Sequence, residues 1–292
     1  MAVKKHRKRL EALDIFSFTI LTLMVILIIF PFYTSVLVSF TTNISYVRKP
    51  VQFFPESFTL ENYSYVIDRM NIFTGYKNTL TIVIIGTALT MFISLTYSYA
   101  LAMRDYPGKK FFFILLLITM YFGGGLIPTY LLLRDLKLIN NVLAIVFICG
   151  VSPFNIIIMK NGIEALPESL DEAARVAGAN EWQIFTKITI PLIKPIVVTF
   201  SLFAAVGYWN EWYWSMITLT KTSVKTLQIM LRAIVDSTDA LEMDISASDF
   251  TEVFNQGMKM AAVVLTMLPI MVVYPFLQKH FAAGILVGAV KM

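Results

Sequence analysis

A carboxylate and a carboxamide stand side by side in a run of apolar and aromatic residues. The run Gly207–Trp214 reads Gly-Tyr-Trp-Asn-Glu-Trp-Tyr-Trp, within an apolar stretch that only Glu211 interrupts. A charge inside a membrane span is costly, so by default it indicates a functional site or a water-filled cavity. Asn and Glu can bond hydroxyl groups, while aromatic rings offer apolar faces to the same ligand. The candidate pathway residues are Trp209, Asn210, Glu211 and Tyr213.

The same run also has simpler interpretations. Trp and Tyr gather where a membrane meets water, so Trp212 and Trp214 could anchor the outer end of a span. Helical spacing puts Tyr208 and Trp212 on one face and Trp209 and Tyr213 on another, so the rings cannot all line one path. Proton transfer by the carboxylate is disfavoured, because no second acid or His accompanies it within the apolar run.

Other reactive side chains are too sparse for catalysis or a metal centre. The single Cys149 cannot form an internal disulfide, and His6 and His280 are too few for a metal cluster. No phosphate-binding Gly-x-x-x-x-Gly-Lys-Ser/Thr motif occurs, and Gly108-Lys109-Lys110 stands in the wrong context. We therefore expect no catalytic residue, no metal site and no cofactor bound by this chain. Any use of ATP must then fall to another polypeptide.

A polar segment, residues 160–194, separates two apolar runs and carries strong helix signals. Pro167 suits a first helical turn, and the carboxylates that follow it occupy the end where a helix dipole favours negative charge. Gly178 fits a helix stop, and Asn180 with Gln183 resembles a capping box that starts a second helix. The segment is therefore predicted to form two short amphipathic helices joined by a glycine turn.

This predicted hairpin admits two interpretations. Its second helix places Trp182, Phe185 and Ile188 on one face, and Pro191 ends it. The hairpin could lie among the lipid headgroups through its aromatic residues. It could instead dock into a groove on a partner protein, as short amphipathic helices often do.

The elements that position these residues are membrane spans. The chain has 292 residues, 57 % hydrophobic and 15 % charged, whereas soluble domains have about 45–50 % apolar and about 25 % charged residues. Six runs reach the length of about 20 mainly apolar residues that a spanning helix needs, which predicts an all-α membrane protein with six transmembrane helices. Gly123-Gly124-Gly125 in the third run predicts a bend or close helix packing. The runs are 15–38, 76–102, 111–132, 139–159, 195–218 and 260–278.

Basic residues orient these spans. If the cluster Lys4–Arg9 lies in the cytoplasm, 14 of the 24 Lys and Arg residues lie on that side. Both termini are then cytoplasmic, and the polar segment 160–194 faces the cytoplasm as well. The first run is longer than the apolar part of a signal peptide and has no small-residue cleavage site, so we expect it to be retained. This topogenic role explains the basic cluster without nucleic-acid binding.

The polar segment resembles a known family motif. Glu172-Ala173-Ala174, Gly178, Ile188 and Ile190-Pro191, at their spacing, look like the EAA loop of bacterial ABC importer permeases. The family pattern ends in Leu-Pro, so Ile190 is a mild apolar departure. The resemblance extends over roughly 74–280 and is closest to the maltose-type branch that carries sugars and oligosaccharides.

The resemblance implies a permease subunit that acts with other proteins. Its loop would be a coupling-helix pair seated in a groove on a separate ATPase, where Glu172 pairs with a basic residue and Gly178 makes the turn. ATP and Mg would be bound by a cytoplasmic ATPase dimer. A homologous second permease would complete the pathway, and an extracytoplasmic solute-binding protein would deliver a saccharide. The ATPase-coupling residues so implied are Glu172, Ala173, Ala174, Gly178, Ile188 and Pro191.

On this basis the chain divides into three parts. Residues 1–73 would hold the basic amino-terminal segment, the first transmembrane helix and an extracytoplasmic loop. Residues 74–280 would form the permease core, with the EAA loop at 164–191. Residues 281–292 would be a cytoplasmic tail.

The leading hypothesis is a multi-pass permease of the bacterial cytoplasmic (inner) membrane that imports an oligosaccharide or polysaccharide fragment, neutral or acidic. The alternative is a stand-alone secondary transporter or channel, which predicts further buried charges and internal symmetry; the sequence shows neither clearly. An intramembrane enzyme would need a nucleophile with a base, or metal ligands, and both His residues lie outside the spans.

Overall fold

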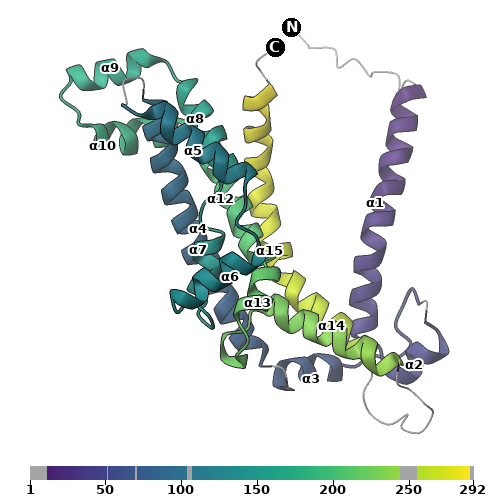
Figure 1. Cartoon of the computed structure of the whole chain (residues 1–292). Helices are drawn as coiled ribbons and strands as arrows, with labels where there is room; N and C mark the ends of the chain where they lie inside the picture. Colours follow the sequence, from purple (N-terminus) through teal and green to yellow (C-terminus); the bar gives the residue numbers. More distant parts are fainter. Residues whose placement is uncertain (1–11, 51, 70, 104–106, 244–254, 290–292) are drawn as a thin grey trace. The chain divides into compact units, whose positions relative to one another are not determined.

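The computed structural model describes residues 12–50, 52–69, 71–103, 107–243 and 255–289. Over these residues the chain is helical, with no strand and one isolated antiparallel bridge between Thr41 and Phe58. The predicted all-α class is therefore confirmed for the described part of the chain. The helices belong to two compact units, residues 1–70 with 234–267 and residues 71–233 with 268–292 (Figure 1).

The first unit begins with α1 (Ala12–Ser39), whose most apolar stretch has no residue buried within this chain. Hydrogen bonds from α3 (Glu61–Arg69) hold the carboxyl end of α1. Asn62, on α3, donates from Nδ2 to the carbonyl oxygens of Ser39 at 3.0 Å and Thr41 at 3.2 Å. The unit also contains α2 (Asn43–Arg48), the later part of α14 (Leu227–Met243) and the first part of α15 (Asn255–Ala289).

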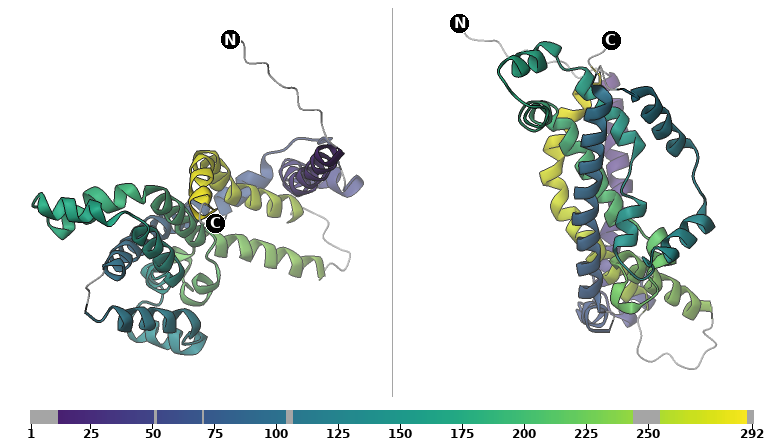
Figure 2. Two further views of the ribbon diagram at one scale, coloured as in Figure 1. Left: turned by 90° about the horizontal axis from the view of Figure 1, so that it is seen from above. Right: turned by 60° about the vertical axis from the view of Figure 1, so that its left-hand side comes forward.

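The second unit is organised around α4 (Ile72–Ala102). Helices α8 (Pro153–Glu164) and α12 (Lys194–Trp209) pack against it (Figure 2). Small residues on α4 allow this close approach: Gly86 lies against the ring of Tyr208, and Ser98 Oγ donates to the carbonyl of Ile156 on α8 at 2.9 Å. The remaining segments are α5 (Lys109–Tyr121), α6 (Leu126–Asp135), α7 (Leu143–Ile148), α9 (Glu168–Val176), α10 (Glu181–Ile184), η1 (Phe185–Thr189), α11 (Ile190–Leu192), α13 (Tyr213–Thr218) and η2 (Thr222–Val224).

Three helices in the described residues are long and apolar enough to cross a membrane. They are Leu13–Ser39, Ile72–Ala102 and Gln256–Val273. Two bent pairs also qualify by length and composition, α5 with α6 and the segment Glu181–Leu192 with α12. The structure thus contains three to five candidate spans, and six spans stay a prediction.

Three of the six predicted runs are interrupted. The third bends by 112° between α5 and α6, where Gly123–Gly125 lie, so the bend expected from these glycines is confirmed. The fourth is not helical between α7 and α8, and α8 starts with Pro153 in its first turn. The fifth leaves the helix after Trp209 and resumes at Tyr213. Broken helices at membrane depth are tolerated where protein or a water-filled cavity satisfies the freed backbone groups.

Candidate functional site

The predicted polar hairpin is present in the second unit. Helix α9 follows Pro167, and Gly178 then turns the chain with φ of +86°, in the left-handed region that favours glycine. Asn180 Oδ1 accepts the backbone N–H of Gln183 at 2.9 Å, and Gln183 Oε1 accepts the backbone N–H of Asn180 at 3.0 Å. The glycine turn and the capping box are both confirmed.

The second half of the hairpin differs from the prediction. The four residues of α10 lead into the π turn η1 and then into α11, which contains Pro191. This helical segment therefore continues to Leu192 and does not stop at the proline. Prolines and π turns are both established causes of helix bending, and the chain turns by 82° between this segment and α12.

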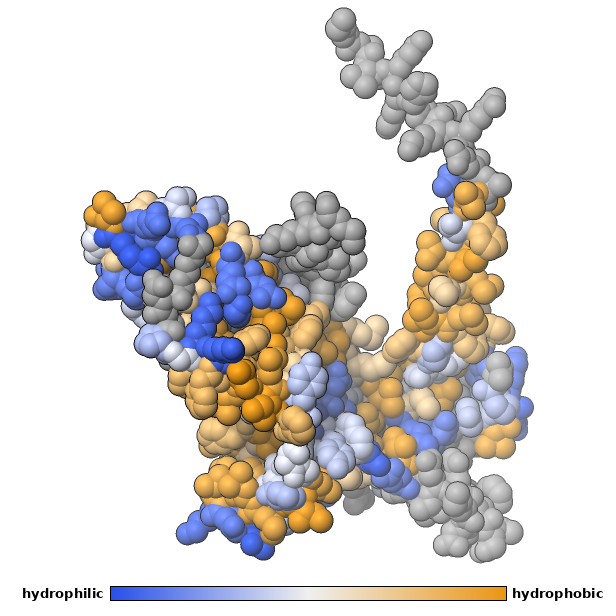
Figure 3. Space-filling view, turned by 45° about the horizontal axis from the view of Figure 1, so that its top comes forward, coloured by the Kyte–Doolittle hydropathy of each residue, from blue (hydrophilic) through white to orange (hydrophobic). Residues whose placement is uncertain are grey.

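The six predicted ATPase-coupling residues all lie on this hairpin. Glu172, Ala173 and Pro191 are exposed, whereas Ala174 and Ile188 are half-buried. No residue of α9 is buried in the chain. In Figure 3 a cluster of hydrophilic residues lies at the upper left, and the sides of the helices below it are mostly hydrophobic. The hairpin thus exposes an acidic side chain beside the apolar side chains of Val176 and Trp182, a mixture suited to contact with another protein.

Charged residues fix the base of the hairpin where α8 ends. Glu164 accepts a hydrogen bond from Lys160 Nζ at 2.6 Å and lies 3.4 Å from Lys109 Nζ. Burial raises the pKa of the Glu164 carboxyl, but the hydrogen bond and charge of Lys160, together with Lys109, outweigh it and hold the pKa below its ordinary value. A cavity of about 750 Å³ adjoins this cluster and is lined by residues of α4, α8 and α9. The hairpin therefore leaves the helix bundle beside a cluster of charged side chains and a cavity.

The four predicted pathway residues surround a helix break and do not share one face. Trp209 ends α12 and is buried, with 6 % of its surface exposed and its ring 6.4 Å from that of Tyr76. Its indole N–H has no hydrogen-bond partner among the described residues. Asn210 is exposed, and Tyr213 is 43 % exposed at the start of α13. Ligand contact stays a prediction for all four, and only two of them are freely accessible in this chain.

Glu211 has a structural role that the sequence analysis missed. Its Oε1 accepts the backbone N–H of Trp214 at 2.7 Å, and its Oε2 accepts the backbone N–H of Ser215 at 3.0 Å and the Ser215 hydroxyl at 2.6 Å. A carboxylate at this place pairs with N–H groups that have no intrahelical partner and complements the helix dipole. Glu211 therefore caps α13, and the assumption of one unbroken span concealed this role.

Removing the cap should destabilise α13. We expect Glu211→Ala to lower the free energy of unfolding by about 1 kcal/mol, the usual cost of losing a helix cap. Hydrogen exchange of the Trp214 and Ser215 amides in the purified chain should accelerate, whereas Glu56→Ala, at an exposed acid elsewhere, should leave it unchanged. Unchanged exchange together with reduced transport would contradict the cap and favour a direct pathway role.

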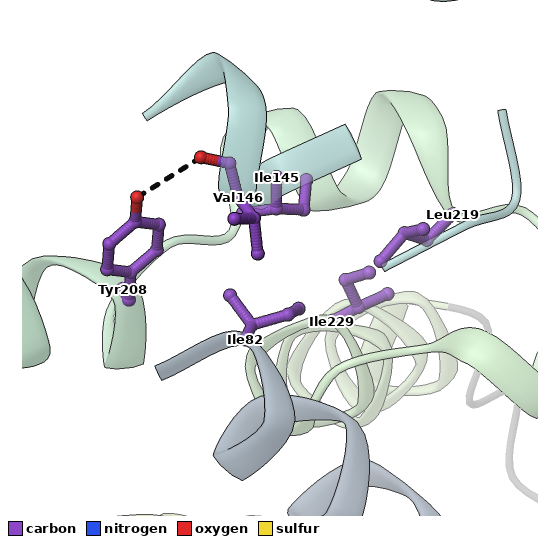
Figure 4. Packing of buried hydrophobic residues seen from close by; sticks show 6 residues of the cluster. All are labelled: Ile82, Ile145, Val146, Tyr208, Leu219 and Ile229. Atoms are coloured by element: carbon purple, nitrogen blue, oxygen red, sulfur yellow. Dashed lines mark hydrogen bonds between the residues drawn. The ribbon is translucent and has the colours of Figure 1, made fainter. Parts of the chain in front are cut away.

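Tyr208 is a second residue whose importance only the structure reveals. Its hydroxyl donates to the carbonyl of Val146 on α7 at 3.3 Å and lies 3.0 Å from Thr90 Oγ1 on α4. One residue before the break in α12, it ties α12 to both neighbours. No local pattern marks it, because its partners lie far away in the sequence. The buried side chains clustered with it are Ile82, Ile145, Val146, Leu219 and Ile229 (Figure 4).

Known proteins are similar to this chain over most of its length. The family described as "Binding-protein-dependent transport system inner membrane component" matches residues 111–287, a range that contains both the hairpin and the helix break. Protein LplC of Bacillus subtilis (strain 168) is 36 % identical over 263 residues, which is 90 % of this chain and 89 % of LplC. The polygalacturonan/rhamnogalacturonan transport system permease protein YtcP of the same strain is 35 % identical over 279 residues, or 95 % of this chain and 98 % of YtcP.

A solved structure agrees with these relatives. One chain from the crystal structure of a bacterial ABC transporter involved in the import of the acidic polysaccharide alginate matches with a TM-score of 0.82 and 27 % sequence identity. The match covers 96 % of this chain and 99 % of that chain.

Proposed function

Because the chain belongs to the family of binding-protein-dependent transport system inner membrane components and is a permease subunit of an ABC importer, we propose that it carries an oligosaccharide or polysaccharide fragment into the cell. The names of two similar proteins support this substrate class. YtcP is named for polygalacturonan and rhamnogalacturonan, and the structural neighbour imports alginate. An oligogalacturonide is therefore the first substrate to test, beside a neutral oligosaccharide.

The single observation that carries the coupling part of the proposal is the polar hairpin. It presents the EAA-like residues on two short helices outside the apolar helix bundle, with Glu172 exposed. We assign it to the groove of a cytoplasmic ATPase, where Glu172 pairs with a basic side chain. ATP and Mg would be bound there, on the ATPase subunits. A tilt of the hairpin is then transmitted to α8 and α12, the helices to which it is covalently joined.

Beside this chain and the membrane lipid, the proposed complex has three kinds of protein component. A homologous second permease completes the pathway as a heterodimer, two ATPase subunits supply the energy, and an extracytoplasmic solute-binding protein delivers the saccharide. The chain crosses the bacterial cytoplasmic membrane six times with both termini in the cytoplasm. Long or bent helices of sufficient length support most of these crossings. The proposed tail, residues 281–292, and the basic cluster Lys4–Arg9 lie largely outside the described residues and side chains.

We place the saccharide path beside the break between α12 and α13. Asn210 and Tyr213 are the accessible contacts there, offering an amide and an aromatic face. The indole N–H of Trp209 has no partner among the described residues, which supports a polar ligand group at the same break. Glu211 does not contact the saccharide in this proposal; it positions Tyr213 by capping the start of α13.

Reconstitution of the complex tests this function. The chain would be placed in proteoliposomes with a candidate second permease, ATPase and solute-binding protein. Uptake of labelled oligogalacturonide and of a neutral oligosaccharide would then be measured with and without ATP. We expect uptake only when ATP, the ATPase and the binding protein are all present. Uptake by the chain alone would instead indicate the alternative, a stand-alone secondary transporter or channel.

A further inference from the structure

A single carboxylate joins the hairpin to a helix that is not its neighbour in the sequence. Glu181, in the first turn of α10, accepts the hydroxyl of Tyr99 on α4 through Oε2 at 2.9 Å. Its other oxygen, Oε1, accepts Arg175 Nε at 2.9 Å from the last turn of α9. Three helices therefore meet at one side chain. Both carboxylate oxygens are used, each by a different helix.

Tyr99, Arg175 and Glu181 are placed to fix the angle between the two halves of the hairpin more than to stabilise the fold. The side chains of Arg175 and Glu181 are 48 % and 47 % exposed, and exposed ion pairs contribute little to the free energy of unfolding. Arg175 and Glu181 stand on either side of the Gly178 turn, so their bond sets the opening of the hairpin. The Tyr99 ring also packs on the Phe185 ring in η1, with centroids 4.9 Å apart. This packing of the Tyr99 ring orients its hydroxyl toward Glu181.

The connection matters because of the place of α4 in the unit. The chain enters the hairpin from α8 and leaves it into α12, and both of these helices pack along α4. Helix α4 itself ends at Ala102, more than 60 residues before the hairpin begins. A force applied to the hairpin reaches α4 directly only through non-covalent contacts. The bond from Tyr99 to Glu181 is a directional contact of this kind.

We infer that Tyr99, Glu181 and Arg175 are positioning residues that keep the hairpin in register with α4 and pass its movement to that helix during transport. This inference rests on the proposed coupling of the hairpin to an ATPase. Tyr99 and Glu181 form the link between helices, and Arg175 holds Glu181 in the orientation that Tyr99 needs. Without the link, the end of α4 receives the movement of the hairpin only through its packing with α8 and α12. ATP is then hydrolysed with less saccharide moved.

The test measures the number of ATP molecules hydrolysed per saccharide imported in the reconstituted complex. Tyr99→Phe removes only the hydroxyl and keeps the packed ring, so assembly with the ATPase should be retained. We expect the ratio of ATP hydrolysed to saccharide moved to rise about five- to tenfold, at the lower end of the range of coupling between protein sites. Tyr97→Phe is the matched control on the same helix, because its hydroxyl donates to the carbonyl of Phe112 at 3.1 Å and not to the hairpin.

Two further variants sharpen the result. Glu181→Ala should raise the same ratio, and Tyr99→Phe in that background should add nothing, because both changes break one link. Glu181→Gln keeps an acceptor for the tyrosine and should restore part of the coupling. An unchanged ratio in Tyr99→Phe, or additive effects in the double variant, would overturn the inference. If Gly178→Leu disrupts coupling and Tyr99→Phe does not, the inferred link between Tyr99 and Glu181 is wrong and the proposed role of the hairpin stands. If neither variant has an effect, the proposed role of the hairpin is wrong as well.

Discussion

Replacing Gly178 by leucine should reduce ATP-driven saccharide uptake by the reconstituted complex about tenfold or more. Gly178 has a φ of +86°, and a Cβ atom there would meet nothing within 4 Å among the described residues. The effect therefore arises from backbone strain, since an L-residue in the left-handed region costs roughly 1–2 kcal/mol. Each 1.4 kcal/mol is about tenfold in an equilibrium constant. The equilibrium between the closed hairpin and its open forms would shift about tenfold toward the open forms, which would weaken the binding of the ATPase.

Gly178→Asn is the matched control, because Asn tolerates the left-handed region better than other residues with a side chain. It should retain much more uptake and ATPase binding than the leucine variant. Co-purification of the ATPase with each variant, and uptake in proteoliposomes, separate assembly from transport. Equal activity of the leucine variant and the unmodified chain would contradict both the role of the turn and the proposed coupling function. Equal loss in the two variants would show that the size of the side chain matters more than the backbone strain.

Gly86→Ala should destabilise the packing of α4 against α12. A Cβ atom at residue 86 would lie 2.5 Å from the ring of Tyr208. That ring is held at its far end by Thr90 and the Val146 carbonyl, so it has little freedom to move aside. Overpacking of a tight core costs about 1–3 kcal/mol, which exceeds the gain of roughly 1 kcal/mol that alanine brings to a helix interior. We expect a melting temperature several degrees lower for the purified chain in detergent, measured by thermal unfolding.

Gly207→Ala is the control, on α12 next to Tyr208, because a Cβ atom at residue 207 meets nothing within 4 Å. It should leave the melting temperature unchanged or raise it slightly. Combining Gly86→Ala with Tyr208→Ala should lower the melting temperature by less than the sum of the two single changes, because the clash no longer exists once the ring is removed. A melting temperature of Gly86→Ala equal to that of the unmodified chain would mean that α4 and α12 are not held as closely as the structure shows.

Local sequence rules predicted the hairpin accurately. The glycine turn, the capping box of Asn180 and Gln183 and the acidic first turn all depend on residues within a few positions of one another. The π turn and the continuation past Pro191 were not predicted. Their hydrogen-bond pattern depends on how the hairpin must turn by 82° to join α12. Local propensity carries no information about such a junction.

The spans show the same division. Apolar length predicted α1, α4 and α15 as long helices, and Gly123–Gly125 predicted the bend between α5 and α6. Apolar length did not predict the breaks after α7 and α12, because Cys149–Ser152 and Asn210–Trp212 sit within stretches that are apolar enough to continue. Glu211 was correctly singled out as unusual. Its function as a cap became visible only once the helix was seen to restart at Tyr213.

The sequence by itself determined the class of this protein. Its excess of apolar residues and the spacing of its few charges require helices in a membrane, and the EAA-like pattern identifies the family of transport permeases. These properties are additive along the chain or local to one segment. Tertiary structure alone decided which distant residues meet: Gly86 with Tyr208, Tyr99 with Glu181, and the helix ends that Tyr208 and Glu211 satisfy. Such pairs depend on the packing of several helices at once, and the polar groups in them need partners that only the folded unit supplies.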